Sequence, residues 1–187
     1  MKKLQEMVEN NLWLALIAAA SFTAAVPVGL LIYPLVSDRL PSLLQDAFGG
    51  IMGGPDWLVI FNVFARNTTA SIVMMLLGVT IVLPLAALFA NGLLVGLVFR
   101  FASDRGLDPV KIAIGIIPHG ILELPAIFLS AALGMRVGLQ LATQRGRRLA
   151  AGWDAAKEAA AVYLSLVSPL LLIAAAVEIL VSKNLIG

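Results

Sequence analysis

The stretch that decides the fold is IAIGIIPHGILELPAIFLSAAL, residues 112–133. A run of this length with so few polar side chains predicts an α-helix that crosses a membrane. It contains His119, the only histidine of the chain, and Glu123 follows four residues later. Four residues of helix rise about 6 Å, so the two side chains lie on one face and can bind the same partner.

This pair of ionisable residues is costly inside a bilayer. Each charge costs roughly 2.5–3.5 kcal/mol at the centre of a membrane helix on insertion scales. Ionisable residues at that depth mark functional sites in membrane proteins, so His119 and Glu123 are the centre of a candidate site. The alternative interpretation is a helix-capping or packing histidine that the neighbouring carboxylate satisfies.

The composition of the whole chain also indicates a membrane protein. The 187 residues are 60% hydrophobic and 13% charged, with a mean hydropathy of +0.98, whereas soluble domains average about 45–50% apolar and 25% charged residues. A soluble fold of this length has too little interior to bury so much apolar surface. The absence of cysteine excludes disulfides and thiolate metal sites. A net charge of +2 gives no basis for binding nucleic acid.

We predict an all-α, polytopic membrane helical bundle that forms a single transmembrane domain over residues 1–187. Its five spans cover about 12–36, 64–83, 85–101, 112–135 and 159–181. As one helix, residues 57–101 would measure about 67 Å, more than twice a hydrocarbon core of roughly 30 Å. We therefore place a broken or re-entrant segment near Pro84. Pro118 predicts a second break, which would put His119 near the start of a half-helix.

The charges indicate how the bundle is oriented. The positive-inside rule places both the lysines of residues 2–3 and the arginines of residues 145–148 in the cytoplasm. Five spans then put the C-terminus outside, as expected for a multi-pass protein of the cell membrane. Residues 38–56 form an outer loop in which apolar side chains recur at helical spacing. This pattern predicts a short amphipathic helix on the membrane surface, or a lid over the bundle.

Five polar residues in or beside the spans need partners that lipid cannot provide: Asn67, Asn91, His119, Glu123 and Glu178. We predict that they converge on one buried site, with a bound cation or water filling the remaining valences. His119, Glu123 and Glu178 could hold a divalent metal such as zinc, with Asn67 and Asn91 completing the polar cluster. The asparagines are also explained as interhelical hydrogen-bonding groups, and Glu178 as a side chain that reaches interfacial water.

Two small-residue steps predict close packing between helices. Gly92 and Gly96 form one GxxxG step, and Gly134 and Gly138 form another. Glycine lets two helix backbones approach closely, so packing is the interpretation that we favour. The same steps also offer contact faces for a homo-oligomer. Asn91 followed by Gly92 is, alternatively, a turn signal.

Four segments of the chain resemble the stage II sporulation protein M family of prokaryotic membrane proteins. They are NTTASIVMMLLG (67–78), NGLLVG (91–96), PHGILELPAIFLSAALGMRVG (118–138) and LLIAAAVEIL (171–180). The resemblance implies a multi-span membrane protein and carries over these positions: Asn67, Asn91, Gly92, His119, Gly120, Glu123, Pro125 and Glu178. In spore formers, one member of that family works with two cell-wall hydrolases in peptidoglycan remodelling during engulfment. The short 38–56 loop gives no support for recruitment of such hydrolases here.

Three classes of function remain. The first is a membrane scaffold or complex subunit, whose partners are the lipid bilayer, a second copy of the chain and other membrane or envelope proteins. The second is an ion- or proton-coupled transporter or channel that uses the ionisable residues at the midplane. The third is an intramembrane metalloenzyme, but catalytic zinc usually has three protein ligands rich in histidine. The chain also lacks HExxH and phosphate-loop motifs, so we favour a non-enzymatic role, and the resemblance favours the scaffold.

Overall fold

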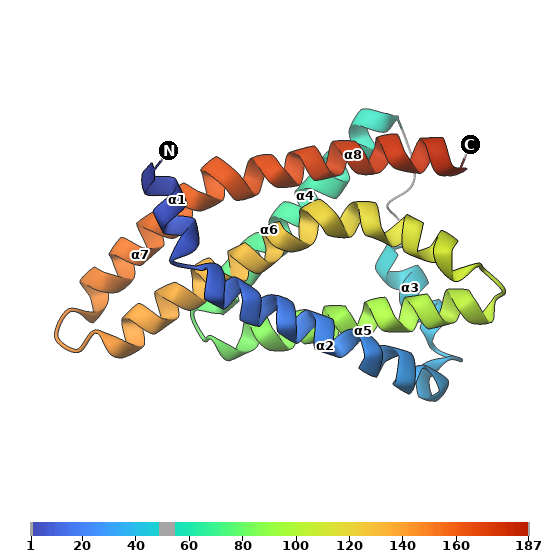
Figure 1. Ribbon diagram of the computed structural model, residues 1–187, viewed down its shortest axis with the longest axis horizontal. Coiled ribbons are helices and arrows are strands. Elements are labelled where there is room, and N and C mark those ends of the chain that lie inside the picture. Colours follow the sequence, from blue (N-terminus) through green and yellow to red (C-terminus); the bar gives the residue numbers. More distant parts are fainter. Residues whose placement is uncertain (1, 49–54, 187) are drawn as a thin grey trace.

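The computed structural model describes the backbone of residues 2–48 and 55–186. Side chains are described over the same ranges, except those of residues 2–5, 45–48, 56, 111–119 and 178–186. Within these ranges the chain consists of helices and short turns and contains no strand, which confirms the predicted all-α class. Figure 1 shows the long helices running back and forth along the longest axis of the molecule.

The described part of the chain forms five long helical rods and two short helices, α1 and α3. In order they are α1 (Lys2–Glu9), α2 (Leu12–Val36), α3 (Leu40–Phe48), α4 (Asp56–Gly78), α5 (Val82–Asp104), α6 (Pro109–Thr143), α7 (Arg148–Val162), the π-helical turn η1 (Tyr163–Val167) and α8 (Ser168–Ile186). Because α7, η1 and α8 follow one another without a turn, they make one rod. The five candidate membrane spans lie in α2, α4, α5, α6 and this last rod, which confirms the predicted number. The second span is Trp57–Gly78 and not about 64–83, because the turn of residues 79–81 ends α4. The N- and C-terminal ends lie at opposite ends of the bundle (Figure 1).

The break predicted near Pro84 lies just before it, in the turn of residues 79–81 between α4 and α5. Ile81 has a φ of 66°, a conformation that a β-branched side chain rarely adopts. The Thr80 hydroxyl accepts a hydrogen bond from the Leu83 N–H at 3.1 Å and so caps the start of α5. Pro84 falls in the first turn of α5, where backbone N–H groups have no partner within the helix. The proline therefore lies just inside a helix start.

The second predicted break is absent, because α6 is one helix that passes through Pro118. A proline removes one backbone donor, and membrane helices tolerate this loss when a bend or a neighbouring group satisfies the freed carbonyl. Figure 1 shows that α6 is curved along its length. His119 consequently occupies the interior of a helix and does not follow a helix start.

The last span begins earlier than predicted. Helix α7 starts at Arg148, not near residue 159, so Asp154 and Lys157 lie inside the helix. These two charged residues are compatible with a helix because they pair with each other on its surface. Lys157 Nζ lies 2.8 Å from Asp154 Oδ1, one helical turn away.

The outer loop predicted over residues 38–56 contains one helix, α3. Leu40 at its start is buried, whereas Leu43 is 58% exposed, so the described part of α3 has apolar side chains both on and away from the bundle. Its placement on a membrane surface stays a prediction. Residues 49–54 of the predicted loop lie outside the described residues.

Glycine contacts join two pairs of helices backbone to backbone. The Gly92–Gly96 step of α5 packs on the backbone of α2, and Gly29 of α2 packs against α5 in return. The Gly134–Gly138 step of α6 packs on α4 in the same way. A Cβ atom placed at Gly78 would lie 2.6 Å from the Cα of Gly134, well inside van der Waals contact. The packing interpretation of both steps is therefore confirmed, and both are used within one chain.

Apolar cores hold the rods together as one body. The first core contains buried side chains from four spans: Leu14, Ala18, Phe22, Met74, Leu88, Ala131, Ala132 and Met135. The rings of Phe22 and Phe128 meet edge to face with centroids 5.6 Å apart, which links α2 to α6. A second core packs the last rod onto α6 through Ala126, Leu133, Ala159, Val162, Tyr163, Val167 and Leu171.

Candidate functional site

The structure brings two of the predicted site residues together. The side-chain amide of Asn67 donates a hydrogen bond to Glu123 Oε1 between α4 and α6. Asn67 is at the midpoint of α4, about 16 Å of helix from either end, which is the centre of the bilayer for a spanning helix. Both side chains are partly buried, and Glu123 makes a further interaction. The carboxyl group thus has protein partners at a depth where lipid offers none.

A hydroxyl network lies one helical turn further along α4. The Ser71 and Tyr163 hydroxyl oxygens are 2.8 Å apart, and both residues are buried. The Thr68 carbonyl oxygen lies 2.8 Å from Ser71 Oγ and 3.3 Å from the Tyr163 hydroxyl. Two hydroxyl protons can fill only two of these three contacts at a time. When Ser71 donates to Tyr163, the Tyr163 hydroxyl donates to the Thr68 carbonyl, and when Tyr163 donates to Ser71, the Ser71 hydroxyl donates to that carbonyl.

The π-helical turn η1 positions Tyr163 in this network. The Ser168 N–H donates to the Tyr163 carbonyl, five residues earlier. Pro169 follows and has no N–H to continue the α-helical pattern, which favours the wider turn. Tyr163 is at the middle of the candidate span Arg148–Val177, so it lies at a depth similar to that of Asn67. We name this group of mid-depth residues the polar seam: Asn67, Thr68, Ser71, Glu123 and Tyr163.

The polar seam joins three rods and contains a carboxyl group, an amide and three hydroxyls. Thr68 Oγ1 is buried and has no hydrogen-bond partner among the described residues. Groups of this kind fix the register of packed helices, because each misplaced partner leaves a polar group unsatisfied in a low-dielectric interior. A carboxyl group and hydroxyls at one depth of a membrane bundle are also groups that can bind a cation or take part in proton transfer.

Asn91 does not join the polar seam. Its side chain is exposed, and its amide donates to the Ala87 carbonyl of the same helix at 3.1 Å. The direction of Asn91 follows from which face of α5 is packed. Leu88 and Gly92 are buried on the face toward α2. Successive side chains of a helix are rotated by about 100°, so Asn91 does not lie on that face. Asn91 therefore does not belong to a buried polar cluster, and Asn91 and Gly92 lie inside a helix and not in a turn.

The side chains of His119 and Glu178 lie outside the described residues. Among the side chains that are described, no three His, Cys, Asp or Glu residues are close enough to hold a metal ion. The amide of Asn67 is bonded to one carboxylate oxygen of Glu123. The metal site of His119, Glu123 and Glu178 thus stays a prediction.

Sequence reasoning missed two interhelical contacts. Arg136 Nη2 lies 3.4 Å from Glu158 Oε2, and this ion pair joins α6 to α7 with both side chains 23% exposed. Arg136 lies inside the Gly134–Gly138 packing step, a position that could have indicated a partner within the bundle. Ser71 is four residues after Asn67 and so shares its helix face. Tyr163 carries no comparable local signal, because its contact depends on how the last rod packs.

Comparison with known families agrees with this architecture. A sequence model of the family described as stage II sporulation protein M matches residues 12–183. This range contains all five candidate spans and the polar seam. No match to a curated protein or to a solved structure was found. Since the match covers nearly the whole chain, the protein belongs to the stage II sporulation protein M family.

Proposed function

We propose that this protein is a homo-oligomeric membrane scaffold whose copies associate through the outer face of α5. The observation that carries the proposal is the exposed Asn91, which lies near the middle of a membrane-spanning helix. The described residues give its Oδ1 no hydrogen-bond partner. Lipid provides none either, whereas an asparagine between two membrane helices gains about 0.6–2 kcal/mol from an interhelical hydrogen bond.

The surface around Asn91 suits a close helix contact. Ala86 and Ala90 are exposed on α5 and form a small-xxx-small step. Small side chains let a partner backbone approach, as the glycine steps do inside the bundle. We call Ala86, Ala90 and Asn91 the outer α5 face.

The packing within the chain favours a fixed framework. Transporters that alternate access rock one part of the bundle against another. Here glycine contacts join α2 to α5 and α4 to α6, and one apolar core joins the two pairs. Such a body can hold partners in position, which is the task of a scaffold for other membrane or envelope proteins.

Cross-linking tests this proposal directly, because the chain contains no cysteine. A single Ala90→Cys variant in native membranes should form a disulfide-linked dimer on oxidation. Leu164→Cys is the matched control, since Leu164 is 71% exposed near the middle of the last rod and away from α5. Adding Asn91→Leu to Ala90→Cys should reduce the dimer. Equal cross-linking of the two cysteine variants would count against the proposal.

An ion- or proton-coupled transporter is the second candidate, and the polar seam is the observation that favours it. A carboxyl group at mid-depth, with hydroxyl groups at a similar depth, suits a proton relay. Proteoliposomes that contain a pH-sensitive dye would reveal proton flux under an applied potential. Flux above that of protein-free vesicles that disappears in Glu123→Gln but persists in Asp154→Asn would favour transport over the scaffold.

The metal site is a separate proposal that the scaffold does not require. If His119, Glu123 and Glu178 bind a divalent cation, the purified protein should carry a stoichiometric metal, which His119→Ala should remove. Metal analysis of both proteins would decide this, and equal metal content would refute the site.

A further inference from the structure

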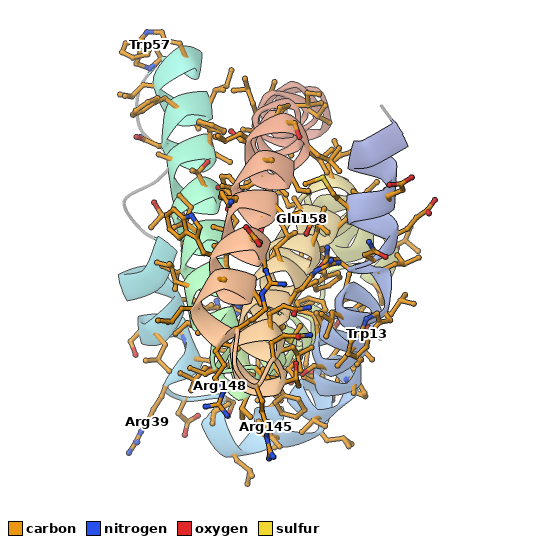
Figure 2. All side chains as sticks on the ribbon, turned by 90° about the vertical axis from the view of Figure 1, so that its left-hand side faces the viewer. Trp13, Arg39, Trp57, Arg145, Arg148 and Glu158 are labelled. Atoms are coloured by element: carbon orange, nitrogen blue, oxygen red, sulfur yellow. The ribbon has the colours of Figure 1, made fainter. Side chains whose placement is uncertain are left out.

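Three exposed arginines gather where α6 turns into α7: Arg145, Arg147 and Arg148. Figure 2 looks onto this end of the bundle, with Arg145 and Arg148 toward the viewer. Gly146 has a φ of 88°, a left-handed conformation that lets the chain reverse between the two helices. We call the three residues the arginine patch.

No carboxylate of the described residues forms a salt bridge with the arginine patch. The nearest acidic residues along α7 have other partners: Asp154 pairs with Lys157 at 2.8 Å, and Glu158 pairs with Arg136 at 3.4 Å. Cations at the start of a helix are also disfavoured by the helix dipole. Arg147 adds a smaller coulombic attraction to Asp154, after that of Lys157. Neither a salt bridge nor the stability of α7 therefore explains three arginines at this place.

The arginines at the opposite end of the bundle are mostly engaged. Arg100 Nε lies 3.1 Å from Asp104 Oδ1. The Arg105 guanidinium lies over the Phe101 ring, 4.4 Å from its centroid. Arg39 is exposed at that end. Among the described side chains, three arginines without a salt bridge therefore lie at the end with the arginine patch, against Arg39 and Arg105 at the opposite end.

Two tryptophans set the depth of the arginine patch in a bilayer. Trp13 at the start of α2 and Trp153 in α7 are 53% and 67% exposed. Tryptophan concentrates at the membrane–water interface. Arg148 lies about 7.5 Å beyond Trp153 along α7, and the polar region of one leaflet is roughly 5–8 Å thick. The guanidinium groups therefore reach the level of the lipid phosphates.

We propose that the arginine patch binds the headgroups of anionic phospholipids in the leaflet that this end of the bundle faces. A guanidinium donates paired hydrogen bonds to phosphate oxygens, so an accessible phosphate with a net negative charge fits the patch. A zwitterionic lipid presents the same phosphate together with a cation that the patch repels. Residues 146–150 line an open recess. Leu149, which is 84% exposed, offers an apolar contact beside the charges.

The test is lipid binding by the full chain purified in a neutral detergent. Phosphatidylglycerol and phosphatidylcholine with identical acyl chains are titrated separately, and bound lipid is counted by native mass spectrometry. Each basic residue near an anionic surface contributes about fivefold to binding. Replacing all three arginines (R145Q/R147Q/R148Q) should therefore reduce the preference for phosphatidylglycerol by up to roughly 100-fold. Added salt should weaken the wild-type preference, since the patch is exposed.

Three controls separate this proposal from its alternatives. Arg39→Gln removes an exposed arginine at the opposite end and should leave the preference unchanged. Inorganic phosphate at the lipid concentration should not displace the lipid, which distinguishes a lipid headgroup from a free phosphate. The triple variant should melt like the wild type in phosphatidylcholine, because the three side chains are exposed and make no salt bridge in the described structure.

Four results would overturn the proposal. They are equal binding of the two lipids, an equal loss in Arg39→Gln, displacement by phosphate, and cross-linking of the patch to an acidic protein without any lipid preference.

Discussion

Gly134→Ala should destabilise the bundle by forcing α4 and α6 apart. A Cβ atom at this position would overlap the Met75 carbonyl oxygen and lie 2.9 Å from the Cα of Gly78. Non-bonded carbon atoms pack best at about 3.5–4.0 Å, so the two backbones would have to separate by up to about 1 Å. A helix backbone cannot rotate away as a side chain does, so the whole contact must give way.

The expected cost follows from two opposing effects. Overpacking typically costs about 1–3 kcal/mol, and a backbone neighbour puts this site near about 3 kcal/mol. Alanine recovers about 1 kcal/mol of helix propensity relative to glycine. The free energy of unfolding should therefore fall by about 2 kcal/mol. For a chain of this length, that loss lowers the melting temperature by about 4–8 °C.

Thermal unfolding of the purified protein in detergent measures this change. Gly120→Ala is the matched control on the same helix, because among the described atoms its Cβ would meet only Leu124 Cδ1, at 3.4 Å. That variant should melt at or above the wild-type temperature. If Gly134→Ala melts as high as Gly120→Ala, then backbone contact through glycine does not hold α4 to α6.

Three further predictions concern the polar seam and the orientation of the chain. Asn67→Leu should cost about 1–3 kcal/mol of stability by removing the amide donor of Glu123, and Asn67→Leu/Glu123→Leu should recover part of it; a double variant no more stable than the single one would exclude direct coupling. Tyr163→Phe should cost about 1 kcal/mol, seen as a drop in melting temperature of about 2–4 °C, and an unchanged value would show that the hydroxyl network contributes nothing to stability. In intact cells, Gly146→Cys should be shielded from an impermeant thiol reagent while Asp46→Cys is labelled, and labelling of Gly146→Cys would reverse the orientation.

Much of the fold follows from the sequence, because apolar runs define membrane helices. The first span was predicted at about 12–36 and is Leu12–Val36, since polar residues border the apolar run on both sides. The start of the last span could not be predicted from hydropathy. In the sequence, Asp154 and Lys157 are typical of a loop, and only the structure shows that they pair on the surface of a helix. The continuity of α6 through Pro118 also depends on packing around the helix.

Less of the candidate site than of the fold could be predicted from the sequence. Asn67 and Glu123 could be connected because each is polar at mid-depth and needs a partner. Asn91 satisfies the same criterion, yet it faces outward because Gly92 occupies the face against α2. The inward or outward direction of a polar residue depends on which helix face is packed. Apolar and small residues surround these spans on all sides, so the sequence leaves that face undetermined.

The mass of the assembly in native lipid tests the scaffold proposal most directly. The full chain is extracted from its membrane in polymer-bounded lipid nanodiscs, and the protein mass is measured by light scattering. We predict at least two copies of the 19.7 kDa chain. Ala90→Phe/Asn91→Leu, which blocks close approach at the outer α5 face, should yield single copies that melt like the wild type. A single copy of the wild-type chain, or an unchanged oligomer in the variant, would contradict the proposed role of this face.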